Sequence, residues 1–289
     1  MSVVKSIILL GMCCVFYSCD QKETKAKPPT PFVRVASVEQ AEIPIYIEAV
    51  GRLTAFNSVD IKPQVTGQLV SLHFEEGGFV KKGQLLYEID SRHYKAILDE
   101  AKAHVEEGKA NHSFALEQVN SYSKLIKEDY VSKLEYQQYA SSERSAKASL
   151  DQSMASLEAA QVNYDFCFIH SPIDGRVGKR LADVGNIVIA DEDSDSTVLL
   201  NITQIDPIFV DFSIPEKYFY RVHKLQKKRP LRIEVFPIGE EKKEFQGTLS
   251  LVNNQISTNT GMLALRGVLE NTQENLWPGL FCRVRLILK

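Results

Sequence analysis

Residues 91–164 read SRHYKAILDEAKAHVEEGKANHSFALEQVNSYSKLIKEDYVSKLEYQQYASSERSAKASLDQSMASLEAAQVNY and contain no proline and a single glycine, Gly108. They are rich in Ala, Lys, Glu, Gln and Ser, a composition that favours helix over other backbone states. One short polar segment, residues 127–132, divides them in two. Composition and break together predict two antiparallel helices joined by a tight turn, an α-helical hairpin over residues 92–164.

Both predicted helices carry small and apolar residues spaced alternately three and four positions apart, the spacing of a coiled-coil seam. In the first helix this register comprises Tyr94, Leu98, Ala101, Val105, Gly108, His112, Ala115, Val119, Tyr122 and Ile126. In the second helix it comprises Tyr136, Tyr139, Glu143, Ala146, Leu150, Ser153, Leu157, Ala160 and Tyr164. Each helix of about 34 residues would be roughly 50 Å long at 1.5 Å per residue. The core of such a rod is too narrow for an active site. Its expected use is to span a distance.

Some members of the register are less favourable for a seam, so we expect the hairpin to be only moderately stable in isolation. These members are Gly108, His112, Glu143 and Ser153. No second metal ligand follows His112 one helical turn later. His112 is therefore interpreted as a packed, hydrogen-bonded histidine rather than a metal ligand.

The length of 289 residues predicts two or three small domains rather than one large core. The formal net charge of −3 offers no basic surplus for nucleic acid. The five cysteines are Cys13, Cys14, Cys19, Cys167 and Cys282. Their spacing matches neither a zinc site nor a disulfide framework. The sequence also lacks a Ser/His/Asp set and an HExxH motif, and we therefore predict a protein that is not an enzyme.

The amino terminus has the pattern of an export signal. Lys5 precedes an apolar run over residues 7–16, which is too short to span a bilayer and typical of a signal peptide. Ser18 followed by Cys19 resembles a bacterial lipoprotein cleavage site, which predicts a signal peptide over residues 1–18 and lipidation of Cys19. Cys13 or Cys14, or an ordinary signal cut elsewhere, are the alternatives. The polar, proline-rich residues that follow predict a tether over residues 19–31.

Sequence of β type lies on both sides of the hairpin. Residues 32–50 and 51–91 contain short runs of β-branched residues, the second interrupted by glycines. Residues 203–289 contain about six strand-like runs and one short helix after Pro215, which predicts a β-barrel. The residues predicted to form structural turns are Gly67, Gly77, Gly83, Pro172, Gly175, Pro278 and Gly279.

Two segments that flank the hairpin resemble the two halves of a biotinyl/lipoyl carrier domain. They are QVTGQLVSLHFEEGGFVKKGQLLYEID (64–90) and FCFIHSPIDGRVGKRLADVGNIVIADED (166–193). Neither an MKM nor a DKA tripeptide is present to carry biotin or lipoate. A lipoyl domain opened by a helical hairpin resembles the periplasmic adaptor, or membrane-fusion, proteins of resistance–nodulation–division (RND) tripartite efflux pumps. TNTGMLALRGVLEN and LWPGLFCRVRL also resemble the closing strands of the adaptor barrel.

This resemblance implies an α+β, elongated multidomain fold without a cofactor. A coiled-coil hairpin (92–164) would be inserted in a split lipoyl domain (51–91 and 165–202), followed by a six-stranded β-barrel with one helix (203–289). Members of the family normally continue into a membrane-proximal domain that pairs with the amino-terminal strands. Residues 32–50 are therefore expected to lose most of their partners.

The resemblance also implies a contact site at the hairpin tip. RND adaptors carry an Arg-x₃-Leu-x₆-Ser pattern there, and this chain has Ser121, Leu125 and Ser132 at that spacing, with serine in place of arginine. An arginine would add a charged, bidentate contact, so its replacement alters partner choice. The remaining predicted contact residues are Lys127, Glu128, Asp129 and Tyr130. The alternative is structural: Leu125 closes the seam and Ser132 caps the second helix, with Glu135 completing a capping box.

The implied function is that of a periplasmic adaptor. It would link an inner-membrane RND transporter to an outer-membrane TolC-like channel, for export of small molecules. A lipid anchor would hold it on the periplasmic side of the Gram-negative inner membrane, and several copies would form a ring, as a trimer or hexamer. The alternatives are an adaptor of an ABC-type exporter and a biotin or lipoyl carrier component.

Overall fold

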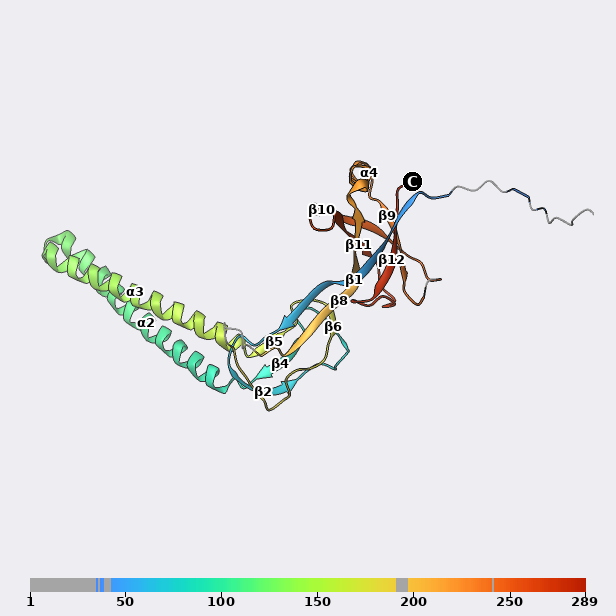
Figure 1. Cartoon of the computed structure of the whole chain (residues 1–289). Coiled ribbons are helices and arrows are strands. Elements are labelled where there is room, and N and C mark those ends of the chain that lie inside the picture. The colour runs from blue at the N-terminus through green and yellow to red at the C-terminus, as the bar shows by residue number, and fades with distance from the viewer. Residues whose placement is uncertain (1–34, 36, 39–42, 191–196, 241) are drawn as a thin grey trace, which may run out of the picture. The chain divides into compact units, whose positions relative to one another are not determined.

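The computed structural model describes residues 35, 37–38, 43–190, 197–240 and 242–289 (Figure 1). The chain divides into two units after Ile43, and the fold below is that of the second unit, Pro44–Lys289. The predicted signal peptide, the tether and Cys19 lie outside the described residues, as do most of residues 32–42.

Six antiparallel strands form a closed barrel, which confirms the predicted architecture. The strands are β1 (Tyr46–Ile61), β8 (Leu200–Pro215), β9 (Arg232–Pro237), β10 (Phe245–Ser257), β11 (Met262–Leu269) and β12 (Phe281–Ile287). Their order is β1-β12-β9-β10-β11-β8, and a further pairing of β1 with β8 closes the ring. Apolar and polar residues alternate along β8 and β12, so that every second side chain enters the barrel core. One short 3₁₀ turn, η2 (Glu216–Tyr218), and α4 (Phe219–Gln226) follow β8 and cover one end of the barrel.

The lipoyl domain is built from both sequence halves around a second core. One sheet has the order β5-β4-β2-β7, with β2 (Gly67–Leu72), β4 (Leu85–Ile89), β5 (Phe168–His170) and β7 (Ile187–Val188). The pairing of β4 with β5 joins the two halves across the inserted hairpin. The short strands β3 (Phe79–Val80) and β6 (Gly175–Val177) extend the barrel sheet through β8. The insertion predicted from the sequence is therefore confirmed.

β1 and β8 belong to both domains. Residues 51–55 of β1 pair with residues 208–212 of β8 in the barrel, and residues 57–61 pair with residues 200–204 in the lipoyl domain. Leu53 accordingly lies in the barrel core and Ile61 in the lipoyl core. The structure thus places the boundaries within these strands, near Phe56 and Ile205, and not at residues 50/51 and 202/203 as predicted.

The start of β1 also corrects a prediction. Residues 46–50, expected to lose their partners, pair with residues 283–287 of β12. The pairing extends one residue further, because the N–H of Leu288 donates to the carbonyl of Ile45 at 2.8 Å. These residues complete the barrel wall.

The glycines predicted to form turns fall into two groups, which differ in the physical reason that requires glycine. Gly77, Gly83 and Gly279 have positive φ angles of 71°, 81° and 95°, as tight turns require. Gly67 and Gly175 instead begin strands, where a Cβ atom would lie 2.5 Å from Ile89 Cγ2 and 2.8 Å from the Thr203 carbonyl oxygen. Their prediction as turn residues is therefore wrong, and close packing explains the glycines. The two prolines of the set are placed as predicted: Pro172 lies in a bend and Pro278 in a turn.

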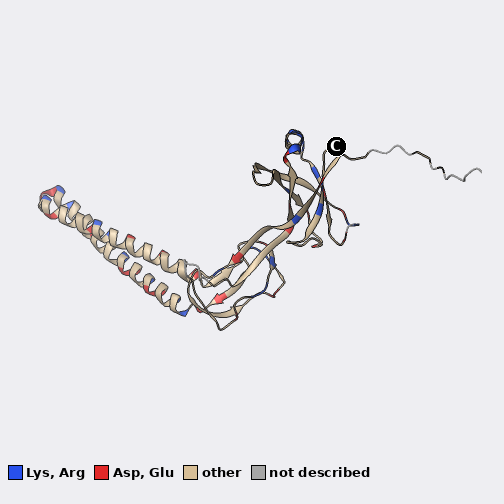
Figure 2. Cartoon of the chain, viewed as in Figure 1, with Lys and Arg blue, Asp and Glu red and all other residues tan. Residues whose placement is uncertain are grey.

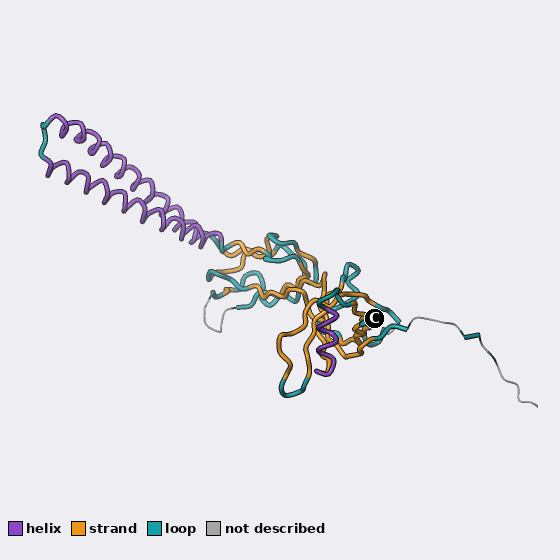
Figure 3. The backbone as a smooth tube through the Cα atoms, turned by 90° about the horizontal axis from the view of Figure 1, so that it is seen from above, coloured by secondary structure: helices purple, strands orange, loops and turns teal. Residues whose placement is uncertain are grey.

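The hairpin consists of α2 (Arg92–Leu125), η1 (Ile126–Glu128) and α3 (Lys133–Asp165). Figure 3 shows the two helices running side by side from the β domains to the connecting turn. Every residue of the predicted seam register is buried or half-buried. None of the described helices has the length and apolar character needed to cross a membrane.

Candidate functional site

The tip of the hairpin is a short, hydrogen-bonded turn. α2 ends at Leu125, and Asp129 adopts a left-handed conformation (φ 59°) that reverses the chain. The N–H of Tyr130 donates to the carbonyl of Leu125 at 3.1 Å. Ser132 precedes α3, and its hydroxyl accepts from the N–H of Glu135 at 3.2 Å. The predicted capping role of Ser132 is confirmed, and it fixes the start of the second helix.

Apolar side chains at the tip face solvent. Leu125 is 38% exposed, Tyr130 74% and Leu134 77%. Ile126, and not Leu125, occupies the end of the seam, so the alternative in which Leu125 closes the seam is wrong. The other predicted contact residues are also exposed: Ser121, Lys127, Glu128, Asp129 and Ser132.

Ser121 and Leu125 lie one turn apart on the same face of α2. The other predicted residues lie in the turn or beside it, and together these exposed residues make up the surface of the hairpin end. We refer to this surface, comprising Ser121, Leu125, residues 127–130, Ser132 and Leu134, as the tip surface. Leu134 was not predicted. The sequence feature that could have indicated it is an apolar residue just after the cap and outside the seam register.

The seam below the tip surface holds the two helices together by polar as well as apolar contacts. The rings of Tyr122 and Tyr139 lie 4.0 Å apart between centroids, and the Tyr139 hydroxyl donates to that of Tyr122 at 3.1 Å. This hydrogen bond, with the charge of Tyr139, raises the pKa of Tyr122. The pair spans α2 and α3 directly below the turn and thus fixes the spacing of the helix ends that carry the tip surface.

Two further seam contacts lie nearer the middle of the hairpin. His112 Nε2 and Glu143 Oε1 form a hydrogen bond at 3.0 Å, which confirms the interpretation of His112 as a packed histidine. Gly108 faces Leu150 so closely that a Cβ atom would lie 3.2 Å from Leu150 Cδ1. Among the described residues, no group of three or more His, Cys, Asp or Glu side chains is placed to hold a metal ion.

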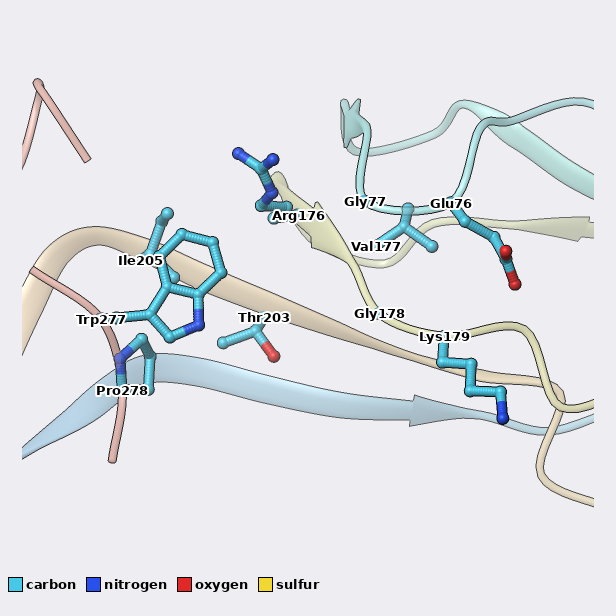
Figure 4. Close-up of a pocket in the computed structure, with 10 residues that line it drawn as sticks. All are labelled: Glu76, Gly77, Arg176, Val177, Gly178, Lys179, Thr203, Ile205, Trp277 and Pro278. Carbon is cyan, nitrogen blue, oxygen red and sulfur yellow. The ribbon is translucent and has the colours of Figure 1, made fainter. Parts of the chain in front are cut away.

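A cleft of about 690 Å³ lies where the lipoyl domain meets the barrel (Figure 4). Arg176 of β6 reaches across to the barrel, where its Nη1 donates to Glu274 Oε2 at 2.7 Å. Its guanidinium also lies 5.3 Å from the ring centroid of Trp277. Trp277 is 46% exposed and lines the cleft. No sequence pattern predicts the Arg176–Glu274 pair, because its partners are 98 residues apart along the chain.

Comparison with known proteins agrees with this geometry. The family model of the RND membrane fusion protein barrel-sandwich hybrid domain matches residues 57–200, and that of the RND membrane fusion protein β-barrel domain matches residues 207–289. The first match begins at Asn57, where β1 passes from the barrel to the lipoyl domain.

Related sequences and structures include multidrug resistance proteins and membrane fusion proteins. The multidrug resistance protein MdtA of Escherichia coli is 36% identical over 267 residues, covering 91% of this chain and 63% of the relative. MdtA of Pectobacterium carotovorum is 32% identical over 255 residues, covering 88% and 61%. The chain thus spans less than two thirds of the length of these relatives.

Solved structures share the fold. A MacA–MexA chimera containing the Pseudomonas aeruginosa MexA α-hairpin domain has a TM-score of 0.63 at 25% identity, covering 86% of this chain and 83% of the other. A membrane fusion protein of Streptococcus pneumoniae has a TM-score of 0.65 at 16% identity, covering 84% and 99%. The two family models, which together match most of the chain, and the shared arrangement of barrel, split lipoyl domain and hairpin show that it belongs to the membrane fusion proteins of RND systems.

Proposed function

We propose that the protein is a periplasmic adaptor subunit of a tripartite RND multidrug efflux system. It links an inner-membrane RND transporter to an outer-membrane TolC-like channel during export of small molecules. The observation that carries the proposal is the helical hairpin inserted between the halves of a lipoyl domain, in a chain that matches both RND domain models. Because both models are RND models, the ABC-exporter alternative is not favoured.

The tip surface is the proposed contact with the channel. It presents exposed apolar side chains, which serve as anchors at protein interfaces when they enter pockets of a partner. Leu125, Tyr130 and Leu134 supply that apolar area, and exposed polar groups at Lys127 and Asp129 surround it. Ser121 supplies a hydroxyl where an arginine would supply a charged fork, so the contact relies more on apolar burial.

The remaining parts of the protein have mechanical roles in this proposal. The hairpin provides reach, the barrel faces the pump, and several copies enclose a conduit as a trimeric or hexameric ring. Lipidation of Cys19 anchors the chain on the periplasmic side of the inner membrane. The adaptor catalyses no reaction and carries no cofactor, and its work is to seal the conduit and transmit conformational change.

Photo-cross-linking in cells tests the channel contact. Tyr130 is replaced by a photoreactive phenylalanine analogue, and the cross-link to the outer-membrane channel is measured with and without Leu125→Asp. The matched control is Leu116→Asp, because Leu116 is 41% exposed on the shaft of α2, close to the 38% of Leu125. We expect Leu125→Asp to abolish the cross-link and to raise drug susceptibility. The control should keep the cross-link and the drug susceptibility of the wild type.

Leu134→Asp is expected to behave as Leu125→Asp does. Far-ultraviolet circular dichroism verifies that each variant retains its helix content. A cross-link of normal yield in a folded Leu125→Asp protein would remove the tip surface from the proposal.

A further inference from the structure

The cleft between the lipoyl domain and the barrel has the size and the lining of a small-molecule site. Its volume of about 690 Å³ falls within the range of ligand pockets, about 300–1,000 Å³. Figure 4 shows Trp277 and Pro278 at one end of the cleft and Glu76 and Lys179 at the other, with Thr203 between them. The barrel therefore supplies one end of the cleft, and the lipoyl domain supplies the other.

The aromatic end of the cleft is held in place by the barrel. Trp277 follows Leu276, which is completely buried. The side chain of Asn271, itself 4% exposed, donates to the carbonyl of Leu276 at 2.8 Å and to that of Ile205 at 3.0 Å. The Arg176 guanidinium lies over the Trp277 ring, and Trp277 is still 46% exposed. Part of a preorganised ring is thus open for stacking by a second aromatic group.

The base of the cleft between its two ends is apolar. Val177 and Ile205 line it, and both belong to the buried residues of the chain. The neighbouring Gly178 has no side chain, and its N–H is already used by the carbonyl of Asn201 at 2.8 Å. A ligand that extends from one end to the other would therefore bury apolar atoms along its middle.

The charged groups of the cleft are paired with one another, except for Lys179. Arg176 Nη1 donates to Glu274 Oε2 at 2.7 Å. Glu76 Oε1 accepts from the N–H of Arg180 at 2.8 Å, and it lies 4.0 Å from Nε of the same arginine. Lys179 is exposed, and none of the ion pairs among the described residues includes it. One cation is thus left for a ligand.

The preference for an anion is a local property of the cleft. Lys and Arg residues and Asp and Glu residues are both distributed over the hairpin and the β domains (Figure 2), and the net charge of the chain is −3. A general positive field therefore does not draw anions to this protein. The attraction comes from the one unpaired lysine at the end of the cleft opposite the tryptophan.

We propose that the cleft binds an aromatic organic anion, with its ring against Trp277 and its carboxylate or sulfonate group at Lys179. The ring stacks on the open part of the indole, and the ammonium group donates a charge-assisted hydrogen bond to the anionic group. The inference goes beyond the proposed function, because this binding needs neither the pump nor the channel.

Titration of the whole purified chain with fluoronaphthoate, followed by fluorine nuclear magnetic resonance, tests the inference. Two further probes carry the same ring with another group: fluoronaphthylmethylamine is cationic and fluoronaphthylmethanol is neutral. The cleft variants are Trp277→Ala, Trp277→Phe, Lys179→Gln and Lys179→Arg. The controls lie outside the cleft: Tyr220→Ala removes an aromatic residue that is 82% exposed, and Lys147→Gln removes an exposed lysine of α3.

We expect fluoronaphthoate to bind the wild type with a Kd of about 1 mM, as is usual for a ligand of this size, and more tightly than the other two probes. Lys179→Gln should raise this Kd about two- to fivefold, and Lys179→Arg should restore it. Trp277→Ala should raise it about three- to tenfold, and Trp277→Phe, which keeps a ring, by less. Both controls should bind as the wild type does.

Three outcomes would each overturn the inference. They are no saturation at about ten times the expected Kd, equal binding of the three probes, and equal Kd values for the wild type and Lys179→Gln. Far-ultraviolet circular dichroism verifies the fold of each variant, and the exposed Lys179 can be changed without disturbing a core. The channel cross-link at Tyr130 is measured separately, so a failure of ligand binding is distinguished from a failure of the proposed function.

Discussion

The hydrogen bond between His112 and Glu143 offers a direct test of how the hairpin seam is stabilised. The two side chains are 24% and 20% exposed and lie 3.0 Å apart across the seam. We consider His112→Ala, Glu143→Ala and the double variant as a double-mutant cycle. A hydrogen bond with a charged partner contributes about 1.5–3 kcal/mol when buried, and the partial exposure here reduces the expected coupling to about 1–2 kcal/mol.

The assay is urea unfolding followed by far-ultraviolet circular dichroism. This signal reports the hairpin, because α2 and α3 have 34 and 33 residues whereas α4 has 8. The losses of unfolding free energy in the two single variants should add up to more than the loss in the double variant, and the difference is the coupling free energy. A coupling free energy of about zero would refute the reasoning, since the two side chains would then be independently solvated.

A second arm of the same experiment replaces both residues by leucine. Leucine at positions 112 and 143 adds two apolar residues to the seam register, and replacing a half-buried polar pair by packed apolar residues is commonly neutral or stabilising. We expect the free energy of unfolding of the double leucine variant to equal that of the wild type or to exceed it by about 1–2 kcal/mol. The polar pair would then serve to fix the alignment of the helices rather than to raise their stability.

Three further predictions address the anchor, the barrel core and the cleft. Cys19→Ser should move the protein from the membrane to the periplasmic fraction and remove the acyl mass, and unchanged retention would exclude lipidation at this residue. Burial raises the pKa of Cys282 to about 11, from 9.0. The protonated thiol therefore stabilises the fold below pH 9, and this contribution is lost as the pH rises toward 11. The difference in unfolding free energy between wild type and Cys282→Val should fall by about 2–3 kcal/mol across that window, whereas a constant difference would contradict the burial of the thiol. Arg176→Ala should shift the fluorescence of Trp277, the one tryptophan of the chain, while changing stability by less than about 1 kcal/mol; an unshifted spectrum would contradict the stacking.

The hairpin was predictable residue by residue because its pattern is local. Leu98, Ala101 and Val105 are buried where the heptad spacing places them, since helix geometry alone fixes which residues share a face. Ser132 was predictable for the same reason, because a cap depends on residues within one turn. Leu134 was missed because an apolar residue outside the seam acquires meaning only once the tip turn exposes it.

The β domains were predictable in type but not in their limits. A boundary is recognised from a sequence by a linker, and no linker separates the barrel from the lipoyl domain, because β1 and β8 continue through both. The roles of Gly67 and Gly175 were missed because the atoms that exclude a Cβ, in Ile89 and Thr203, approach only in the tertiary structure. The cleft pair Arg176–Glu274 depends on tertiary structure in the same way.

The shared strands also determine where the two domains are mechanically coupled. The pairing of β1 with β8 is irregular between Ala55 and Asn57, and the rings of Phe56 and Phe209 meet there at 4.8 Å. On the barrel side, Arg266 donates two hydrogen bonds to the carboxylate of Asp211, at 2.6 and 2.9 Å, and its guanidinium lies over the ring of Phe209. Regular strand pairing resists bending on both sides of the irregularity, so a change in the angle between the domains concentrates at Phe56. The Arg176–Glu274 pair crosses the same boundary outside the shared strands, and a change in this angle therefore acts on the cleft lined by Trp277.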